Sequence, residues 1–208
     1  MMRKIIVTLF SCLAMTLQAA DGIEILDKAS QRITATGSAE LSFTATAFSG
    51  TQPQGSSSGQ IRVKGQMFKI ITDEMITWYN GQTQWSMMPG SGEVNMTVPT
   101  EEEKQAVNPY AFIQLYKHGY KASVKKGSLR NTDTYEVHLT ATDSKQEIKE
   151  IYVDVRKSDY TLLCIRLRQN TDWHRIVLHS IQAVKDMSDS EFSFPAQDYP
   201  DVEIIDLR

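Results

Sequence analysis

The stretch Glu74–Met88, with the sequence EMITWYNGQTQWSMM, decides the fold. Two runs of alternating residues flank Asn80-Gly81, and an Asn-Gly pair in that position favours a two-residue type I′ turn between antiparallel strands. With this turn, Trp78 pairs with Thr83. Because side chains alternate between the two faces of a strand, both tryptophans of the hairpin share one face, which is predicted to point inward.

Similar runs, rich in valine, isoleucine, threonine and aromatic residues, continue on both sides of this hairpin. Their short connections favour an antiparallel meander over crossover connections. The segment 49–58, rich in glycine and serine, is predicted to be a mobile loop. The predicted strands cover residues 41–48, 57–64, 67–72, 74–79, 82–88, 93–98, 121–126, 133–141, 147–155, 160–169 and 173–183.

Two segments have the pattern of amphipathic helices. The first ends at Gly37 and carries apolar residues at helical spacing: Ile25, Leu26, Ala29 and Ile33. The second is predicted over residues 101–118, where Thr100 and Glu103 match a capping box. The chain is therefore predicted to be α+β and mainly β, with about eleven strands in one curved sheet, which the helices cover. Such a sheet can enclose an apolar hollow.

The first twenty residues have the pattern of a secretory signal peptide. Residues 1–4 include two basic residues, and an apolar run that is too short to span a bilayer follows. The small residues Ala19-Ala20 then precede the polar Asp21. We expect residues 1–20 to be removed and residues 21–208 to form a single domain that works outside the cytoplasm.

The two cysteines have different predicted fates. A second interpretation of the N-terminus takes Cys12 as a lipid-modified first residue, because Leu9-Phe10-Ser11-Cys12 is similar to a bacterial lipobox. Only about five apolar residues precede Cys12, against about 7–15 in a signal peptide, so cleavage after Ala20 is favoured. Cys164 is then the only cysteine, which excludes an intramolecular disulfide, and its apolar surroundings predict a buried, inert thiol.

Charge and motif content argue against several functions. Residues 1–20 hold two basic and no acidic residues, so their removal takes the net charge from −3 to −5 and argues against a nucleic-acid partner. The histidines, at positions 118, 138, 174 and 179, lack the spacing of a metal site. No Walker or dinucleotide-binding pattern occurs. The one G-x-S-x-G match, at Gly55–Gly59, lies in the predicted loop rather than at the strand-to-helix turn that a nucleophilic serine requires. We therefore expect no enzymatic activity, no metal and no cofactor.

A set of segments in a fixed order resembles a known family. GQIRVK at Gly59–Lys64 is followed by Phe68-Lys69-Ile70, NGQTQW at Asn80–Trp85, Val94-Asn95-Met96, Asn108-Pro109-Tyr110 and Phe192-Ser193-Phe194. This order resembles the LolA-like periplasmic carriers of outer-membrane lipoproteins. The ending Tyr199–Arg208 is similar to the Bacteroidetes branch of that family.

The resemblance implies an unclosed antiparallel barrel with a helical lid. It implies a monomeric periplasmic carrier that takes acylated lipoproteins from an inner-membrane ABC lipoprotein-releasing complex to an outer-membrane acceptor. An apolar hollow suits such cargo, since each exposed CH₂ costs about 0.8 kcal/mol. The predicted cavity lining is Phe43, Ile61, Val63, Phe68, Ile70, Ile76, Trp78, Trp85, Met87 and Met96 from the sheet, with Phe112 and Leu115 from the lid.

One motif departs from the family pattern. The better-known carriers follow Val-Lys with Arg-Pro, and that arginine is linked to lid closure, whereas Val63-Lys64 is followed here by Gly65-Gln66. This pair suits a tight hairpin turn. Because the arginine is absent, the sequence does not indicate how a lid would be held closed. Other functions compatible with the sequence are a periplasmic lipid-binding sensor or regulator of an envelope stress pathway, a carrier of another hydrophobic ligand, and a secreted hydrolase with an apolar cleft.

Overall fold

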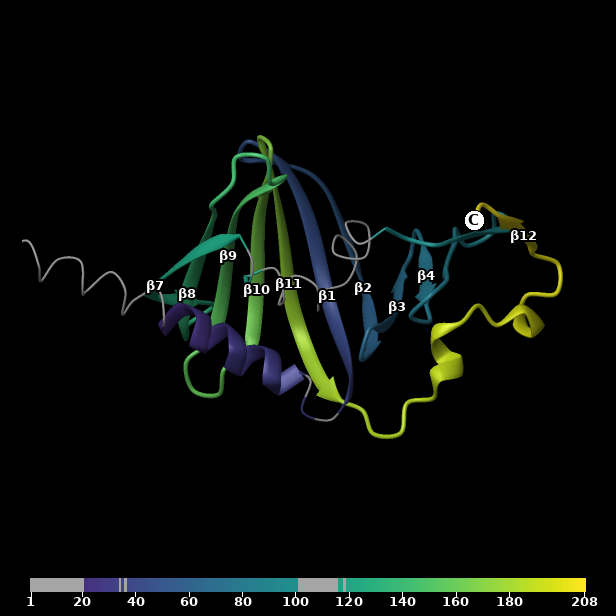
Figure 1. The fold of residues 1–208 in the computed structure, drawn as a ribbon, viewed down its shortest axis with the longest axis horizontal. Helices are drawn as coiled ribbons and strands as arrows, with labels where there is room; N and C mark the ends of the chain where they lie inside the picture. Colours follow the sequence, from purple (N-terminus) through teal and green to yellow (C-terminus); the bar gives the residue numbers. More distant parts are fainter. Residues whose placement is uncertain (1–20, 34, 36, 101–115, 118) are drawn as a thin grey trace, which may run out of the picture.

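In the part of the chain that the structure describes, twelve strands form one continuous sheet (Figure 1). The structure, a computed structural model, describes residues 21–33, 35, 37–100, 116–117 and 119–208. The strands are β1 (Ser38–Ser49), β2 (Gln52–Lys64), β3 (Met67–Thr72), β4 (Ile76–Tyr79), β5 (Gln84–Met87), β6 (Glu93–Thr97), β7 (Tyr120–Leu129), β8 (Thr132–Ala141), β9 (Ile148–Arg156), β10 (Leu162–Gln169), β11 (Asp172–Ala183) and β12 (Glu203–Asp206).

The sheet is an unclosed, mainly antiparallel one, as predicted. Its strand order is β12-β6-β5-β4-β3-β2-β1-β11-β10-β9-β8-β7, so the long pair β1 and β11 joins the two halves of the meander. All eleven predicted strands are present. The strand that was not predicted, β12, adds to the edge strand β6 in parallel.

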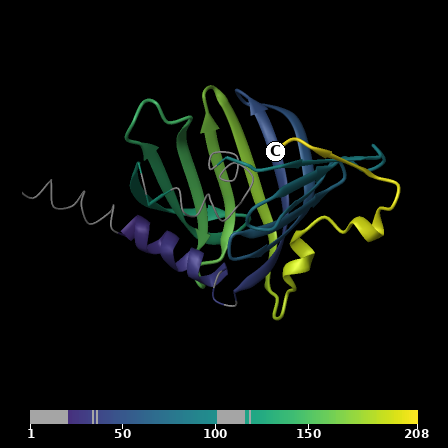
Figure 2. The ribbon, with the colours of Figure 1, turned by 45° about the vertical axis from the view of Figure 1, so that its right-hand side comes forward.

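A helix over residues 21–33 lies across β8, β9 and β10 (Figures 1 and 2). Its predicted apolar residues, Ile25, Leu26, Ala29 and Ile33, are all buried. Gly37 has a φ of +78°, a conformation that glycine adopts without strain, and the chain turns there into β1. The second predicted helix, over residues 101–118, lies outside the described residues apart from Tyr116 and Lys117.

The hairpin between β4 and β5 has a different register from the predicted one. Trp78 pairs with Trp85 rather than with Thr83, and the loop contains four residues, closed by a bond from the Asn80 N–H to the Thr83 carbonyl. A type I′ turn requires positive φ at both central residues, and only Gly81 has it. The Asn80 side chain instead accepts hydrogen bonds from the N–H groups of residues 82 and 83 and stabilises the wider loop.

The segment 49–58, predicted to be a loop, is mostly strand. Ser49 pairs with Gln52 across a two-residue connection in which Gly50 has a φ of +59°. Hydroxyl groups then bridge β1 and β2, with Thr44 bonded to Ser58 at 2.8 Å. Serine is a weak strand former in isolation, but these cross-strand bonds and the long β1–β11 pair hold it in the sheet.

Two hydrophobic cores lie on opposite faces of the sheet. The main core joins the helix to the face that includes Leu41, Val63 and Leu139, which is called the inner face below. The second core lies on the outer face of β4–β6, under the C-terminal segment, residues 187–206. That segment contains the 3₁₀ helices η1 (Asp189–Phe192) and η2 (Ala196–Asp198). The second core contains Trp78, Met87 and Val94, with Ile76, Trp85, Phe194, Tyr199 and Val202 packed against it.

Polar contacts attach the C-terminal segment to β2. Arg62 forms an ion pair with Glu191 at 2.8 Å, and Lys64 forms one with Asp189 at 2.6 Å. The Phe194 ring meets Trp78 edge-on, with 5.5 Å between the ring centroids. The segment therefore covers side chains that a free edge of the sheet would expose to water.

Replacing Gly59 by alanine is expected to lower the free energy of unfolding by about 1–3 kcal/mol. A Cβ at this position would lie 2.2 Å from the carbonyl oxygen of Ile71 and 3.1 Å from the Phe43 ring, so the β2–β3 pair would have to shift. Urea unfolding followed by circular dichroism measures the loss. Gly55→Ala is the matched control, because nothing lies within 4 Å of its Cβ; equal stability of the two variants would contradict the expectation.

Candidate functional site

An apolar space lies between the helix and the second half of the sheet. Its walls come from the helix, from Tyr116, which precedes β7, and from β8, β9 and β10. Its polar lining is minor, as expected for a site that receives hydrocarbon. The lining residues are Leu26, Ala29, Tyr116, Leu139, Ile151, Val153, Leu162 and Ile165.

This space is narrow in the observed conformation. Its volume is about 10 Å³, which corresponds to about one water molecule. An acyl chain is much larger, so a ligand of that kind needs this space to widen. Helix and sheet contact each other here through apolar side chains, which can exchange one apolar neighbour for another at low cost.

Polar contacts hold the helix over the space at several points. The Tyr116 hydroxyl donates to Asp27 Oδ1 at 2.5 Å, and Arg32 forms an ion pair with Asp159 at 3.1 Å. Burial and the bond to Asp27 raise the pKa of Tyr116, so the hydroxyl stays protonated and remains a donor at physiological pH. Lys28 lies over the Tyr160 ring, with its Nζ 4.8 Å from the ring centroid. These contacts fix the helix at the rim, while its apolar side faces the space.

The predicted lining residues divide between the two cores. Those in the main core, or packed against it, are Phe43, Ile61, Val63, Phe68 and Ile70. Those in the second core, or packed against it, are Ile76, Trp78, Trp85 and Met87. Met96 pairs with Trp85 and is partly buried, and the remaining two, Phe112 and Leu115, lie outside the described residues. None of the ten described residues lines the space under the helix, so their role as ligand contacts stays a prediction.

The sheet residues that do line the space were not singled out from the sequence. They come from the predicted strands 133–141, 147–155 and 160–169, where apolar residues alternate with charged ones. That alternation was the available signal, because it marks one apolar face on three neighbouring strands.

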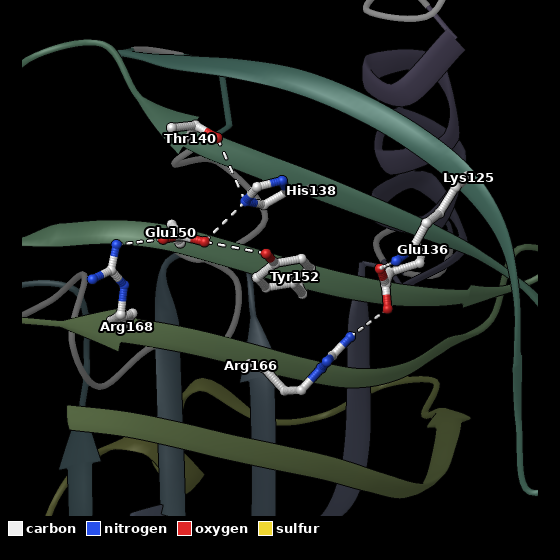
Figure 3. Close-up of polar contacts among 8 residues, drawn as sticks. All are labelled: Lys125, Glu136, His138, Thr140, Glu150, Tyr152, Arg166 and Arg168. Carbon is white, nitrogen blue, oxygen red and sulfur yellow. Dashed lines mark hydrogen bonds and ion pairs between the residues drawn. The ribbon is translucent and has the colours of Figure 1, made fainter. Parts of the chain in front are cut away.

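The outer face of β7–β10 carries a network of charged groups (Figure 3). Glu136 lies 2.8 Å from Lys125 and 2.6 Å from Arg166, which also approaches the buried Asp154 at 3.5 Å. Burial alone would raise the pKa of Glu136, but the two cations outweigh it and lower that pKa. Burial raises the pKa of Asp154, against the effect of Arg166. The network therefore joins four strands across the face that turns away from the helix.

A second group of residues on this face surrounds Glu150. Its carboxylate accepts a bond from the Tyr152 hydroxyl at 3.1 Å, contacts Arg168, and lies 3.2 Å from His138 Nε2. Thr140 approaches the same His138 nitrogen at 3.5 Å (Figure 3). The rings of His138 and Tyr152 stack with centroids 4.1 Å apart. Both oxygens of the Glu150 carboxylate are thus engaged with neighbours on the sheet, which is the arrangement of a structural network.

Replacing Glu136 by glutamine is expected to cost about 1–2 kcal/mol at pH 7, because two charge-assisted contacts are lost. The lowered pKa means that this contribution is present above the ordinary carboxyl pKa of 4.5 and is lost as the pH falls through the folded-state value. Unfolding curves at pH 7 and near pH 3 measure the difference between wild type and variant. A difference that stays constant over this range would contradict the assignment.

The cysteine and the possible metal ligands of the described residues do not form a reactive or metal-binding group. Cys164 is buried, as predicted, and burial raises the pKa of its thiol to about 11, which keeps it protonated. Among residues 21–33, 35, 37–100, 116–117 and 119–208, no group of three or more histidine, cysteine or acidic side chains could hold a metal ion. Over the same residues, no helix combines the length and the hydropathy that a bilayer crossing requires.

The sequence model of a family described as the outer membrane lipoprotein carrier protein LolA matches residues 11–171. The chain belongs to this family. The match ends before β11, so the C-terminal segment of this LolA-family protein lies beyond it. No curated protein matches the chain.

Solved structures with a similar fold have very different sequences. An uncharacterised conserved protein from Thermus thermophilus superposes with a TM-score of 0.57 at 7% identity, covering 88% of this chain and 97% of that one. A DUF1329 family protein from Desulfovibrio piger gives a TM-score of 0.50 at 11% identity, with 86% and 98% covered. A LolA superfamily protein from Nitrosomonas europaea gives 0.46 at 12% identity, with 82% and 96% covered. The first two support the unclosed sheet and its helix.

Proposed function

We propose that this LolA-family protein is a non-enzymatic carrier of acylated lipoproteins in the bacterial periplasm. The observation that carries the proposal is the apolar space under the helix, walled by side chains from β8, β9 and β10. Family membership supports it, since the family is described as lipoprotein carriers. The acyl chains would lie between the helix and the inner face of the sheet and leave the peptide outside.

Loading requires an exchange of apolar contacts. In the structure the helix residues Leu26 and Ala29 close the space against Ile151 and Leu162. When the helix moves away, an acyl chain takes the place of these side chains, so the sheet residues stay covered. The free energy gained per CH₂ removed from water, about 0.8 kcal/mol, offsets the loss of the helix contacts. The affinity is thus the difference between two similar free energies, one gained by covering the acyl chain and one lost with the helix contacts. A small difference suits a carrier that must release its cargo.

The proposed route follows from the N-terminus and from the family. Residues 1–20 have the pattern of an export signal, which would place the mature chain in the periplasm. We propose an inner-membrane ABC lipoprotein-releasing complex as the donor and an outer-membrane protein as the acceptor. Gly65-Gln66 forms the tight turn between β2 and β3, in which Gly65 has a φ of +56°. In place of a lid-closing arginine there, the rim contacts of the helix would hold it closed.

Titration of the delipidated protein with a triacylated cysteine peptide tests the proposal. We expect saturable binding of one peptide and no binding of the same peptide without acyl chains. Free palmitate and a sterol, added separately, distinguish a carrier of another hydrophobic ligand. Binding of either of these with no affinity for the triacylated peptide would contradict the lipoprotein assignment.

Replacing Tyr116 by phenylalanine is expected to weaken the closed state of the helix. The hydroxyl that donates to Asp27 is lost, while the ring that lines the space remains. A hydrogen bond to a charged group contributes about 1.5–3 kcal/mol, so the amides of residues 21–33 should exchange about tenfold faster or more. Hydrogen exchange followed by mass spectrometry measures this rate. Tyr120→Phe is the control, because its hydroxyl bonds to the Ile148 carbonyl on the sheet; unchanged exchange in the Tyr116 variant would argue against the contact as a closing element.

A further inference from the structure

The inner face of the sheet changes from apolar to polar between β3 and β5. Paired residues on neighbouring strands lie side by side, so the register defines rows of side chains across the sheet. One row on the inner face runs through Val63, Phe68, Tyr79 and Gln84. The next row runs through Ile61, Ile70, Thr77 and Ser86. The polar side chains thus continue the same face that carries the main core.

The polar members of these rows contact one another and leave one group without a partner. Thr77, which is 6% exposed, approaches the Ser86 hydroxyl at 3.5 Å, and Gln84 Nε2 approaches the same hydroxyl at 3.4 Å. Gln84 Oε1 is buried and makes no hydrogen bond in the structure. If the amide oxygen and nitrogen of Gln84 exchanged places, Oε1 would accept a hydrogen bond from the Ser86 hydroxyl and Nε2 would have no partner. In either orientation one amide group is buried and free to bond a ligand.

We infer that Thr77, Gln84 and Ser86 form a polar subsite for the ester and amide groups that link acyl chains to the peptide of the cargo. This inference rests on the proposed carrier function. An acylated cysteine carries amide and ester carbonyls and an amide N–H directly beside its hydrocarbon, and the Gln84 amide can donate to the first or accept from the second. The buried end of the Gln84 amide, which has no partner in the structure, would gain one on binding.

The positions of the two sites fit one amphipathic ligand. The space under the helix reaches β10, and the polar subsite begins at β4. Five strand-to-strand steps of about 4.8 Å separate them along the sheet, or about 24 Å, which is comparable to an extended long acyl chain. The main core, which includes Phe68 and Tyr79, lies between them. The acyl chains would therefore follow the inner face and end with their polar junction at β4–β5.

Binding of two different ligands distinguishes a specific polar subsite from non-specific hydrophobic binding. The triacylated cysteine peptide carries the polar junction, whereas the apolar fluorophore N-phenylnaphthylamine carries neither ester nor amide. In full-length protein, Gln84→Met should raise the dissociation constant of the triacylated peptide about tenfold, because a hydrogen bond is lost at nearly constant volume. The constant of the fluorophore should stay within about twofold. Ser86→Ala should act in the same direction, and Gln82→Met, at an exposed turn position, should leave both unchanged.

The outcomes are distinct for the subsite and for the carrier function. Equal affinities of wild type and both variants for the triacylated peptide would overturn the subsite and leave the carrier function standing. Equal weakening of both ligands would also overturn it, since the side chains would then act through the fold. A wild-type protein that binds the fluorophore but not the triacylated peptide would overturn both proposals.

Discussion

Replacing Trp78 by alanine is expected to lower the free energy of unfolding by about 3–5 kcal/mol. The side chain is 1% exposed, and its ring packs against Phe194 and Tyr199 of the C-terminal segment. Its removal leaves a cavity between that segment and β4–β5. The measurement is urea unfolding followed by far-ultraviolet circular dichroism.

The same variant tests whether Trp78 contacts the ligand. Because the ring lies on the outer face, we expect the variant, under conditions where it is folded, to bind the triacylated peptide as wild type does. Weaker binding would indicate that Trp78 contacts the ligand, as the sequence predicted. Trp173→Ala is the matched control, since this tryptophan is only partly buried on the outer face of β11, and its loss should cost about 1 kcal/mol.

Replacing Ala29 by phenylalanine is expected to weaken binding of the triacylated peptide at least about 100-fold. Ala29 is 2% exposed and points from the helix into the space between helix and sheet. A phenylalanine ring would occupy the volume that an acyl chain needs and would compete with it for the same apolar walls. The phenylalanine side chain fills about the same volume as several CH₂ groups of the acyl chain. Displacing that many CH₂ groups is sufficient to weaken binding of the peptide about 100-fold.

Ala183→Phe provides the control for this second variant, because Ala183 is exposed at the end of β11. Calorimetric titration gives the affinities, and circular dichroism checks that both variants keep the wild-type fold. Undiminished binding by a folded Ala29 variant would exclude the space under the helix as the acyl site.

Alternation and turn chemistry predicted most of the sheet. The strands were found because residues such as Val137 and Leu139 alternate with polar neighbours, and each alternation records one buried face. Gly65 correctly predicted a tight turn, since its positive φ is a property of the turn itself. The strand β12 was missed because four residues that pair with β6 in parallel carry no turn signal of their own.

The covering of each face could not be predicted in the same way. The period of a strand shows which side chains lie together, but it does not show which of the two faces meets the helix. Trp78 and Met87 are buried, as expected for an inward face, but the C-terminal segment covers them rather than the helix. Tyr79, on the opposite face, belongs to the main core. These assignments depend on contacts between residues more than one hundred positions apart, such as Trp78 and Phe194.

Native mass spectrometry of the full chain purified from its own cell envelope tests the central claim most directly. The account predicts a population with one bound acylated species, which leaves intact on activation and is identified by fragmentation as a lipid-modified cysteine. It also predicts that the delipidated protein takes up a triacylated peptide. Protein that is empty as purified, and that stays empty in the presence of this peptide, would contradict the claim that the helix covers an acyl-chain site.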